Sequence, residues 1–180
     1  LILDNPAASV ERRKQSKAAP VIPNREQFAR LVKQIRAADI RARAAGDLAE
    51  LLAYSGMRLA EATAMRWADV DFERGVFTVT GGAGGTKNSE QRTVPLFPAL
   101  RELLERMRAG RDVSPDAPLI PIATAKKAIA TACEKTGLPH FTHHHMRHYF
   151  VSNAIEAGVD FKVIAAWVGH KDGGVLVAKT

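Results

Sequence analysis

The sequence predicts a mainly α-helical domain with one small three-stranded antiparallel β-sheet, an α+β fold. Apolar residues recur every three or four positions along most of the chain, which is the period of an amphipathic helix. Between residues 70 and 96 short β-branched stretches bounded by turn residues replace this pattern, which indicates strands. The 180 residues suffice for one compact domain with a tail.

The first helix is expected to start at Asn24. Asn24 and Gln27 have the spacing of a capping box, in which each side chain binds the other residue's backbone N–H. Apolar residues at helical spacing carry this helix to about Ala45, unbroken or with one interruption. Gly46 and Asp47 are expected to restart the chain ahead of a leucine-rich stretch.

The strands follow a turn and a short helix. After Gly56, a helix is predicted over Leu59–Met65, and a β-hairpin is predicted around the turn Arg74–Gly75. A third strand is predicted over Arg92–Leu96. Pro95 lacks a backbone N–H, which marks this strand as an edge strand or its end.

The second half of the chain is expected to be helical. The predicted segments surround Leu100–Met107 and Ala125–Cys133, run from Thr142 to Gly158, and run from Asp160 to Gly169 with Phe161, Ile164 and Trp167 facing inward. Cys133 lies on an apolar stripe and is expected to be an inert core thiol.

The stretch Thr142–Phe150 combines a helix start with several basic side chains. Thr142 is a good N-cap residue. Met146 and Tyr149 belong to an apolar stripe that should face the core, whereas His144 and Arg147 fall on the other side, three positions apart and therefore adjacent. A guanidinium beside an imidazole suits an anionic group whose protons must be moved.

Composition favours a polyanionic partner and excludes some classes of protein. Twenty-six Lys and Arg against 19 Asp and Glu give a formal net charge of +7. One cysteine cannot form an intrachain disulfide. No apolar run approaches the length needed to span a membrane.

Residues 1–22 have little apolar periodicity and contain a basic cluster, Arg12, Arg13, Lys14 and Lys17. One interpretation is a linker or arm that lies on DNA phosphates. The other is a solvated disordered tail.

Five polar residues stand at predicted turns or helix starts and could together act on a phosphodiester: Arg58, Lys87, His144, Arg147 and His170. Two arginines can bind phosphate oxygens and offset the charge of a phosphoryl-transfer transition state. A lysine can protonate a leaving oxygen, and histidines can transfer protons near neutral pH. No carboxylate cluster suited to Mg²⁺ is visible, which argues against two-metal nuclease chemistry.

At these residues the chain resembles the tyrosine recombinases, or phage integrases, from about Asn24 onward. Tyr54–Glu61 resembles the family's first arginine box, Thr86–Pro95 its lysine hairpin, and Thr142–Phe150 its His-x-x-Arg box. Trp167–His170 resembles the segment that carries the last histidine. Several motifs in the family's order make a strong signal where any one alone would be weak.

The resemblance implies a catalytic domain that needs no cofactor and no metal. A tyrosine hydroxyl would attack the scissile phosphate of double-stranded DNA and form a 3′-phosphotyrosyl bond with a free 5′-hydroxyl. Another strand's 5′-hydroxyl would then reverse the step, so that the phosphoester energy is kept.

The resemblance also implies a role for each candidate residue. Arg58 and Arg147 would bind the phosphate, with Glu61 bracing Arg58. Lys87 would protonate the 5′-oxygen, His144 would assist proton transfer, and His170 would hydrogen-bond the phosphate. Asn88 and Arg92, on the lysine hairpin, would contact DNA.

The chain departs from the family pattern in two ways. His143 and His145 flank His144 where the family usually has proline and aspartate. The nucleophilic tyrosine is also missing, because the only tyrosines are Tyr54 and Tyr149 and neither is at the family's position. We therefore expect a catalytic domain over residues 23–180, cut before a nucleophile that follows Thr180.

Residues 1–22 would then be the trailing linker of an absent N-terminal core-binding domain. The resemblance further implies a tetramer on DNA, a fragment that is monomeric in isolation, and a cytoplasmic, nucleoid-associated protein encoded by a bacterium, phage or genomic island.

Two other functions stay open on the sequence alone. A non-catalytic DNA-binding relative is the alternative if the tyrosine is absent from the parent protein. A zinc-binding protein is a further one, because His144 and His148 have the i, i+4 spacing of metal sites within a cluster that also holds His140, His143 and His145. No third ligand set is evident beyond Cys133.

Overall fold

The structure is a computed structural model and describes residues 21–39, 42–80, 91–109 and 113–170. The helices are α1 (Arg25–Ala38), α2 (Arg43–Ser55), α3 (Leu59–Ala64), α4 (Pro98–Arg108), α5 (Lys126–Thr136), α6 (His143–Glu156) and α7 (Phe161–Val168). The strands are β1 (Val70–Asp71), β2 (Val76–Val79) and β3 (Arg92–Pro95), with a 3-10 turn over Trp67–Asp69. Mainly helical architecture with one three-stranded antiparallel sheet confirms the predicted fold class.

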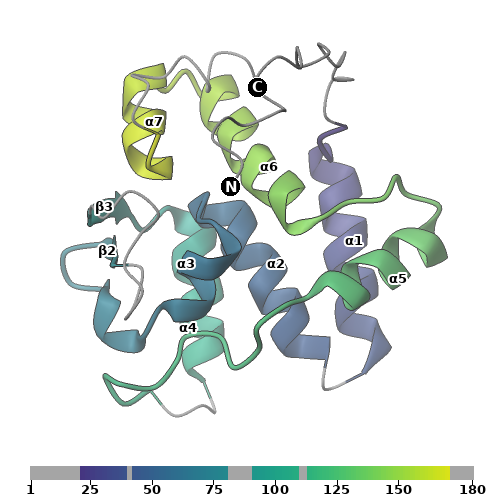
Figure 1. Ribbon diagram of the computed structural model, residues 1–180, viewed down its shortest axis with the longest axis horizontal. Helices are drawn as coiled ribbons and strands as arrows, with labels where there is room; N and C mark the ends of the chain where they lie inside the picture. The colour runs from purple at the N-terminus through teal and green to yellow at the C-terminus, as the bar shows by residue number, and fades with distance from the viewer. Residues whose placement is uncertain (1–20, 40–41, 81–90, 110–112, 171–180) are drawn as a thin grey trace, which may run out of the picture.

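Helix α2 is the centre of the domain. It contacts α1, α3, α4, α5 and α6, which surround it in Figure 1. Its leucines and alanines are buried on every side of the helix, so it can pack against several neighbours at once. The sheet lies beside this bundle, on the side where α7 is found (Figure 1).

The expectation that Gly46 and Asp47 restart the chain is wrong, since both lie inside α2. The aliphatic stem of Arg36 lies over Gly46, where a Cβ would come within 2.9 Å of Arg36 Cγ. Arg36 also donates a 2.6 Å hydrogen bond to Asp47 Oδ1. Gly46 and Asp47 therefore form the packing and hydrogen-bonding site of Arg36 from α1. Local sequence signals do not reveal this contact.

The sheet has the order β1-β2-β3, so β3 is an edge strand as Pro95 predicted. Phe77 pairs with Val94, and Val79 pairs with Arg92. Directly opposed residues of an antiparallel pair share one face of the sheet. Because Phe77, Val79 and Val94 are buried, that face is the inner one, and Arg92 belongs to it.

Helices α6 and α7 form a smaller apolar cluster at one end of the domain. It consists of Phe150, Val151, Ile164, Ala165 and Val168. Asp160 caps α7 as predicted, accepting a 2.8 Å hydrogen bond from Lys162 N. Phe161, which we expected to face inward, is instead 43% exposed. None of the helices in the described ranges is both long and apolar enough to cross a membrane.

Candidate active site

Two arginines from distant parts of the sequence meet at one pocket. Arg58 is the N-cap of α3, just after the left-handed turn at Gly56 that ends α2. Arg147 lies in the second turn of α6. The pocket between them has a volume of about 310 Å³ and is lined by Met57, Arg58, Leu59, Thr142, His143, His144 and Arg147. It joins the first arginine box to the His-x-x-Arg box.

The C-terminal end of α7 accepts hydrogen bonds from three arginines. Arg92 Nε donates to Trp167 O at 2.7 Å, Arg147 donates to Val168 O at 2.7 Å, and Arg58 donates to Gly169 O at 3.3 Å. The last carbonyls of a helix have no partner within the helix and carry partial negative charge. The backbone carbonyls at the end of α7 thus bind three guanidinium groups.

Glu61 lies between Arg58 and Arg92 and is buried, with a side-chain exposure of 4%. Its Oε1 accepts from Arg58 at 2.9 Å, and its Oε2 accepts from Arg92 at 2.6 Å. Burial acts to raise the pKa of Glu61, but hydrogen bonds from Arg92 and Arg58 outweigh it and hold the pKa below the ordinary value. Glu61 is therefore a carboxylate at neutral pH and orients Arg58.

Arg147 is only 5% exposed. Besides Val168 O, its guanidinium donates to Gly56 O, and it lies 2.9 Å from His170 Nε2. A guanidinium can only donate, so Nε2 of His170 accepts and the imidazole is neutral. Burial, followed by the charge of Arg58, lowers the pKa of Arg147 to about 9, which leaves it charged at neutral pH.

The helical wheel placed Arg147 on the side of α6 away from the core, yet this side chain is buried. Its surroundings are polar, because α7 and the turn at Gly56 cover this side of α6 and supply backbone carbonyls as hydrogen-bond acceptors. A wheel of one helix cannot show that another segment covers its polar face.

His144 stands exposed at the rim of the pocket. Its ring meets that of His148 edge-on, with centroids 4.4 Å apart. Partial burial, followed by the charge of Arg147, lowers the pKa of His144. His144 is therefore neutral at pH 7 and able to accept a proton.

His143 and His145 accept hydrogen bonds from backbone N–H groups. His143 Nε2 accepts from Ala125 N at 3.0 Å, which ties the start of α5 to the start of α6. His145 Nδ1 accepts from Thr142 N at 2.9 Å and completes the N-terminal cap of α6. Both imidazoles must leave these nitrogens unprotonated. The position of His145 three residues after Thr142 is a local signal that could have predicted its capping role, which we did not predict; nothing local indicates the contact of His143.

Several predicted site residues lie outside the described residues: Lys87, Asn88, Arg12, Arg13, Lys14 and Lys17. Among the described ones, the structure brings together Arg58, Arg147, His170 and Glu61, with His144 at the rim. Arg92, expected to contact DNA, has its guanidinium directed at Glu61 and Trp167 O.

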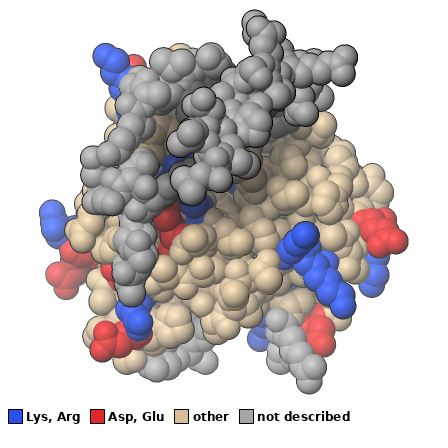
Figure 2. Space-filling view, viewed as in Figure 1, with Lys and Arg blue, Asp and Glu red and all other residues tan. Residues whose placement is uncertain are grey.

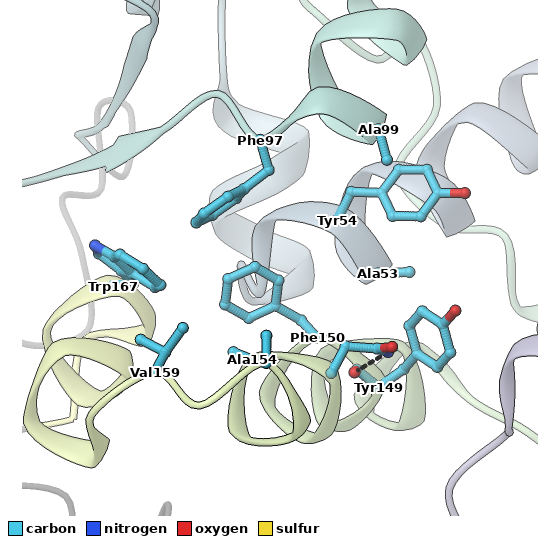
Figure 3. A pocket seen from close by; sticks show the side chains of 11 residues that line it. Ala53, Tyr54, Phe97, Ala99, Tyr149, Phe150, Ala154, Val159 and Trp167 are labelled. Carbon is cyan, nitrogen blue, oxygen red and sulfur yellow. Dashed lines mark hydrogen bonds between the residues drawn. The ribbon is translucent and has the colours of Figure 1, made fainter.

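The two tyrosines, Tyr54 of α2 and Tyr149 of α6, lie away from the arginine pocket. They line an apolar pocket of about 320 Å³ in which the rings of Phe97, Phe150 and Trp167 gather (Figure 3). Tyr149 stacks on Phe28 with ring centroids 4.6 Å apart. Burial, and then the charge of Glu50, raises the pKa of Tyr54 to about 12, and burial also raises the pKa of Tyr149. Neither hydroxyl belongs to the arginine pocket.

Where the face drawn in Figure 2 is not covered by grey atoms, blue and red side chains are dispersed among neutral ones. No group of three or more His, Cys, Asp or Glu suited to a metal ion occurs within the described ranges. The arginines of the pocket are held mainly by backbone carbonyls and by Glu61.

The fold is that of a tyrosine recombinase catalytic domain. The sequence matches the phage integrase family over residues 24–177, and the chain belongs to that family.

Among its relatives, tyrosine recombinase XerA of Pyrococcus furiosus is 29% identical over 179 residues, which cover 93% of this chain and 59% of that protein. Tyrosine recombinase XerC of Xanthomonas axonopodis pv. citri is 29% identical over 177 residues, covering 93% and 56%. The chain thus spans less than two thirds of the length of these relatives.

Solved structures share the fold. The Tn1549 transposon integrase in complex with transposon right end DNA superposes with a TM-score of 0.74 at 18% identity, over 93% of this chain and 63% of that one. The crystal structure of XerA recombinase gives a TM-score of 0.70 at 19% identity, over 94% and 61%.

Proposed function

We propose that this chain is the catalytic part of a site-specific DNA recombinase or integrase that cleaves and rejoins strands through a 3′-phosphotyrosyl intermediate. The observation that carries the proposal is the convergence of Arg58, Arg147 and His170 at one site in a member of the phage integrase family. Its substrate would be double-stranded DNA, and the Tn1549 transposon integrase, which shares the fold, was solved in complex with DNA.

Arg58 and Arg147 would bind the two non-bridging oxygens of the scissile phosphate. Each guanidinium is anchored internally through some of its five N–H groups and has others left for a ligand. Anchored donors need no reorganisation when negative charge develops, which is the source of electrostatic catalysis. His170 lies against Arg147 through Nε2, and this nitrogen would take up a proton in order to hydrogen-bond the same phosphate.

Two proton transfers accompany the reaction. The attacking tyrosine oxygen forms its bond to phosphorus and loses its proton, for which neutral His144 at the rim is the acceptor we assign. The bond from phosphorus to the 5′-oxygen breaks, and Lys87 would protonate that oxygen. Both transfers reverse on religation, so no cofactor is consumed.

The attacking tyrosine is proposed to be neither Tyr54 nor Tyr149. Both line the apolar pocket, and burial disfavours ionisation of both hydroxyls. A residue outside these 180 would then supply the nucleophile. The arm with Arg12, Arg13, Lys14 and Lys17, together with Asn88, would add contacts to the DNA backbone.

Assembly and location follow from the same proposal. Recombination of two duplexes needs four active sites, so we propose a tetramer on DNA and a monomer for the free 180-residue chain. A protein that acts on the DNA of a bacterium, phage or genomic island would lie with the nucleoid in the cytoplasm.

A covalent-trapping assay tests the proposal. Nicked duplexes drawn from the ends of the genetic element that carries the gene would be incubated with the 180-residue chain and with the product of the complete gene. We expect the chain to bind DNA without a covalent adduct, and the complete product to form an adduct that Arg147→Ala abolishes. An adduct that survives this substitution would contradict the assigned phosphate site. Binding without any adduct from the complete product would instead indicate a non-catalytic DNA-binding relative.

A further inference from the structure

The side chain of Arg92 is placed on the inner face of the sheet by the strand register. Arg92 pairs with Val79, and the next inward pair along the strands is Phe77 with Val94. The other three residues of these two pairs are buried, and the side chain of Arg92 is itself only 11% exposed. A long cationic side chain on the buried face of a sheet requires partners inside the protein.

All three guanidinium nitrogens of Arg92 make internal hydrogen bonds. Nη1 and Nη2 bind the two oxygens of Glu61, at 3.1 Å and 2.6 Å, and Nε donates to Trp167 O at 2.7 Å. Two parallel bonds to one carboxylate fix its orientation as well as its position. Arg92 therefore links β3 to α3 and to the end of α7.

One partner of Arg92, Glu61, also binds Arg58, and the other, Trp167 O, lies two residues before the carbonyl of Gly169 that accepts from Arg58. The Glu61 oxygens that bind Arg92 also accept from Arg58, Oε1 from the guanidinium at 2.9 Å and Oε2 from the backbone N–H at 2.8 Å. Gly169 O accepts from Arg58 as well, and a Cβ added to Gly169 would lie only 3.1 Å from Arg92 Nη1. Arg92 thus packs against the two groups that hold Arg58.

We propose that Arg92 is a positioning residue of the phosphate pocket, which fixes Glu61 and the end of α7 so that they orient Arg58, and which does not itself contact DNA. The DNA-binding part of this inference rests on the proposed function, whereas the link from Arg92 to Arg58 concerns the free protein. Arg58 needs such support because it is an N-cap residue with a partly exposed side chain, 29% accessible.

The first experiment examines the DNA-free chain by carbon-13 NMR of carboxyl groups and nitrogen-15 NMR of arginine side chains. In Arg92→Gln, Glu61 stays buried but loses its bidentate partner, so its pKa should rise from the wild-type value and the Arg58 Nε–H signal should shift. Arg92→Lys, which keeps the charge but not the paired geometry, serves if the glutamine variant does not fold. An unchanged Glu61 titration and an unchanged Arg58 signal would overturn the proposal.

A matched control is available on α4. Arg101 donates to Phe72 O at 2.7 Å and is also partly buried beside the sheet region, but no described contact joins it to Glu61 or Arg58. Arg101→Gln should leave the Glu61 pKa and the Arg58 signal as in the wild type.

The second experiment is a double-mutant cycle on binding to a fluorescein-labelled duplex at fixed low salt. Arg92→Gln and Arg58→Ala should each weaken binding about tenfold, the size of one charge-assisted hydrogen bond. If Arg92 acts through Arg58, the double variant should bind about as weakly as Arg58→Ala alone. Losses that multiply to about a hundredfold would show a separate DNA contact and overturn the proposal.

The two experiments separate the two proposals. If the wild-type chain and Arg101→Gln both fail to bind the duplex, the proposed function fails. The NMR titration then still decides whether Arg92 positions Glu61 and Arg58.

Discussion

At the scale of single residues, Arg147 shows how a buried cation is accommodated. Its guanidinium donates three of its five N–H groups to Gly56 O, Val168 O and His170 Nε2, which lie at the end of α2 and the end of α7. Backbone carbonyls bring partial charge without a second titratable group, so Arg147 keeps its positive charge for a ligand. Its role in holding α2 and α7 together is separable from its proposed role in binding phosphate.

Arg147→Met should therefore destabilise the protein even without DNA. The substitution leaves two buried carbonyl acceptors without their donor, and we expect a loss of about 3 kcal/mol in the free energy of unfolding. Urea denaturation followed by circular dichroism measures it. Arg30→Met is the matched control, since Arg30 is exposed and donates to Thr136 O at 2.9 Å, and it should cost less than about 1 kcal/mol. Equal losses would contradict the account.

At the scale of elements, the junction between α2 and α6 depends on Gly56. This residue has φ of 66°, and an added Cβ would lie 2.4 Å from Cδ1 of Phe150. The ring of Phe150 packs in turn on Phe97, with centroids 5.8 Å apart. The turn that presents Arg58 is therefore set by a close approach of backbone to an aromatic ring.

Gly56→Ala should cost about 3 kcal/mol or more in the free energy of unfolding, since it adds a clash with Phe150 to the cost of a left-handed alanine. Gly137→Ala isolates the backbone effect, because Gly137 has φ of 64° and nothing within 4 Å of an added Cβ. That variant should lose only about 1 kcal/mol. Thermal melts of both variants test the difference. Equal decreases in melting temperature would mean that the Phe150 ring moves to accommodate the added methyl group, and would contradict the prediction.

The start of α6 makes stability depend on pH. Burial, followed by the charges of His144, His145, Arg147 and His170, lowers the pKa of His148 to about 4 from an ordinary value of 6.5. Partial burial also lowers the pKa values of His143 and His145. Over this window the unfolded chain binds more protons than the native one, so stability must fall as the pH falls.

We expect the free energy of unfolding to decrease steadily as the pH is lowered from about 6.5 towards 4. His148→Gln removes the most strongly shifted of these imidazoles and should flatten the profile. Urea titrations at several pH values compare the two proteins. A wild-type profile that is level across the window, or a variant that keeps the full slope, would contradict this explanation.

At the scale of the whole molecule, secondary structure and motif order could be predicted from the sequence, whereas contacts between distant segments could not. The alternation of apolar residues and the turn chemistry predicted the sheet, and the caps at Asn24 and Asp160 predicted helix starts. Family order predicted that Arg58, Arg147 and His170 meet. These features are encoded locally or in motif order.

Contacts between distant segments could not be predicted in the same way. Arg36 packs on Gly46 and Asp47, and Arg147 is buried under the end of α7. Both contacts depend on which segment of the chain covers which face of a helix. The inward position of Arg92 could be predicted in part. Arg92 lies two residues before Val94, so both side chains lie on the inner face once the strand register is known. Its motif alone suggested an outward, DNA-facing side chain.

Whole-molecule charge also bears on the proposed binding to DNA. The formal net charge of +7 predicts affinity for any duplex, and that affinity should fall steeply with salt. Such general attraction must be distinguished from phosphate binding at the pocket, since many basic proteins show the former.

The central claim is that the pocket at Arg58 and Arg147 binds a phosphate of duplex DNA, and salt-dependent fluorescence anisotropy tests it most directly. Arg58→Ala and Arg30→Ala remove the same charge, one at the pocket and one on the exposed side of α1. We expect Arg58→Ala to weaken binding about tenfold and to reduce the salt slope by about one contact, while Arg30→Ala stays near the wild type. Equal losses from both substitutions would show general attraction alone and would contradict the claim.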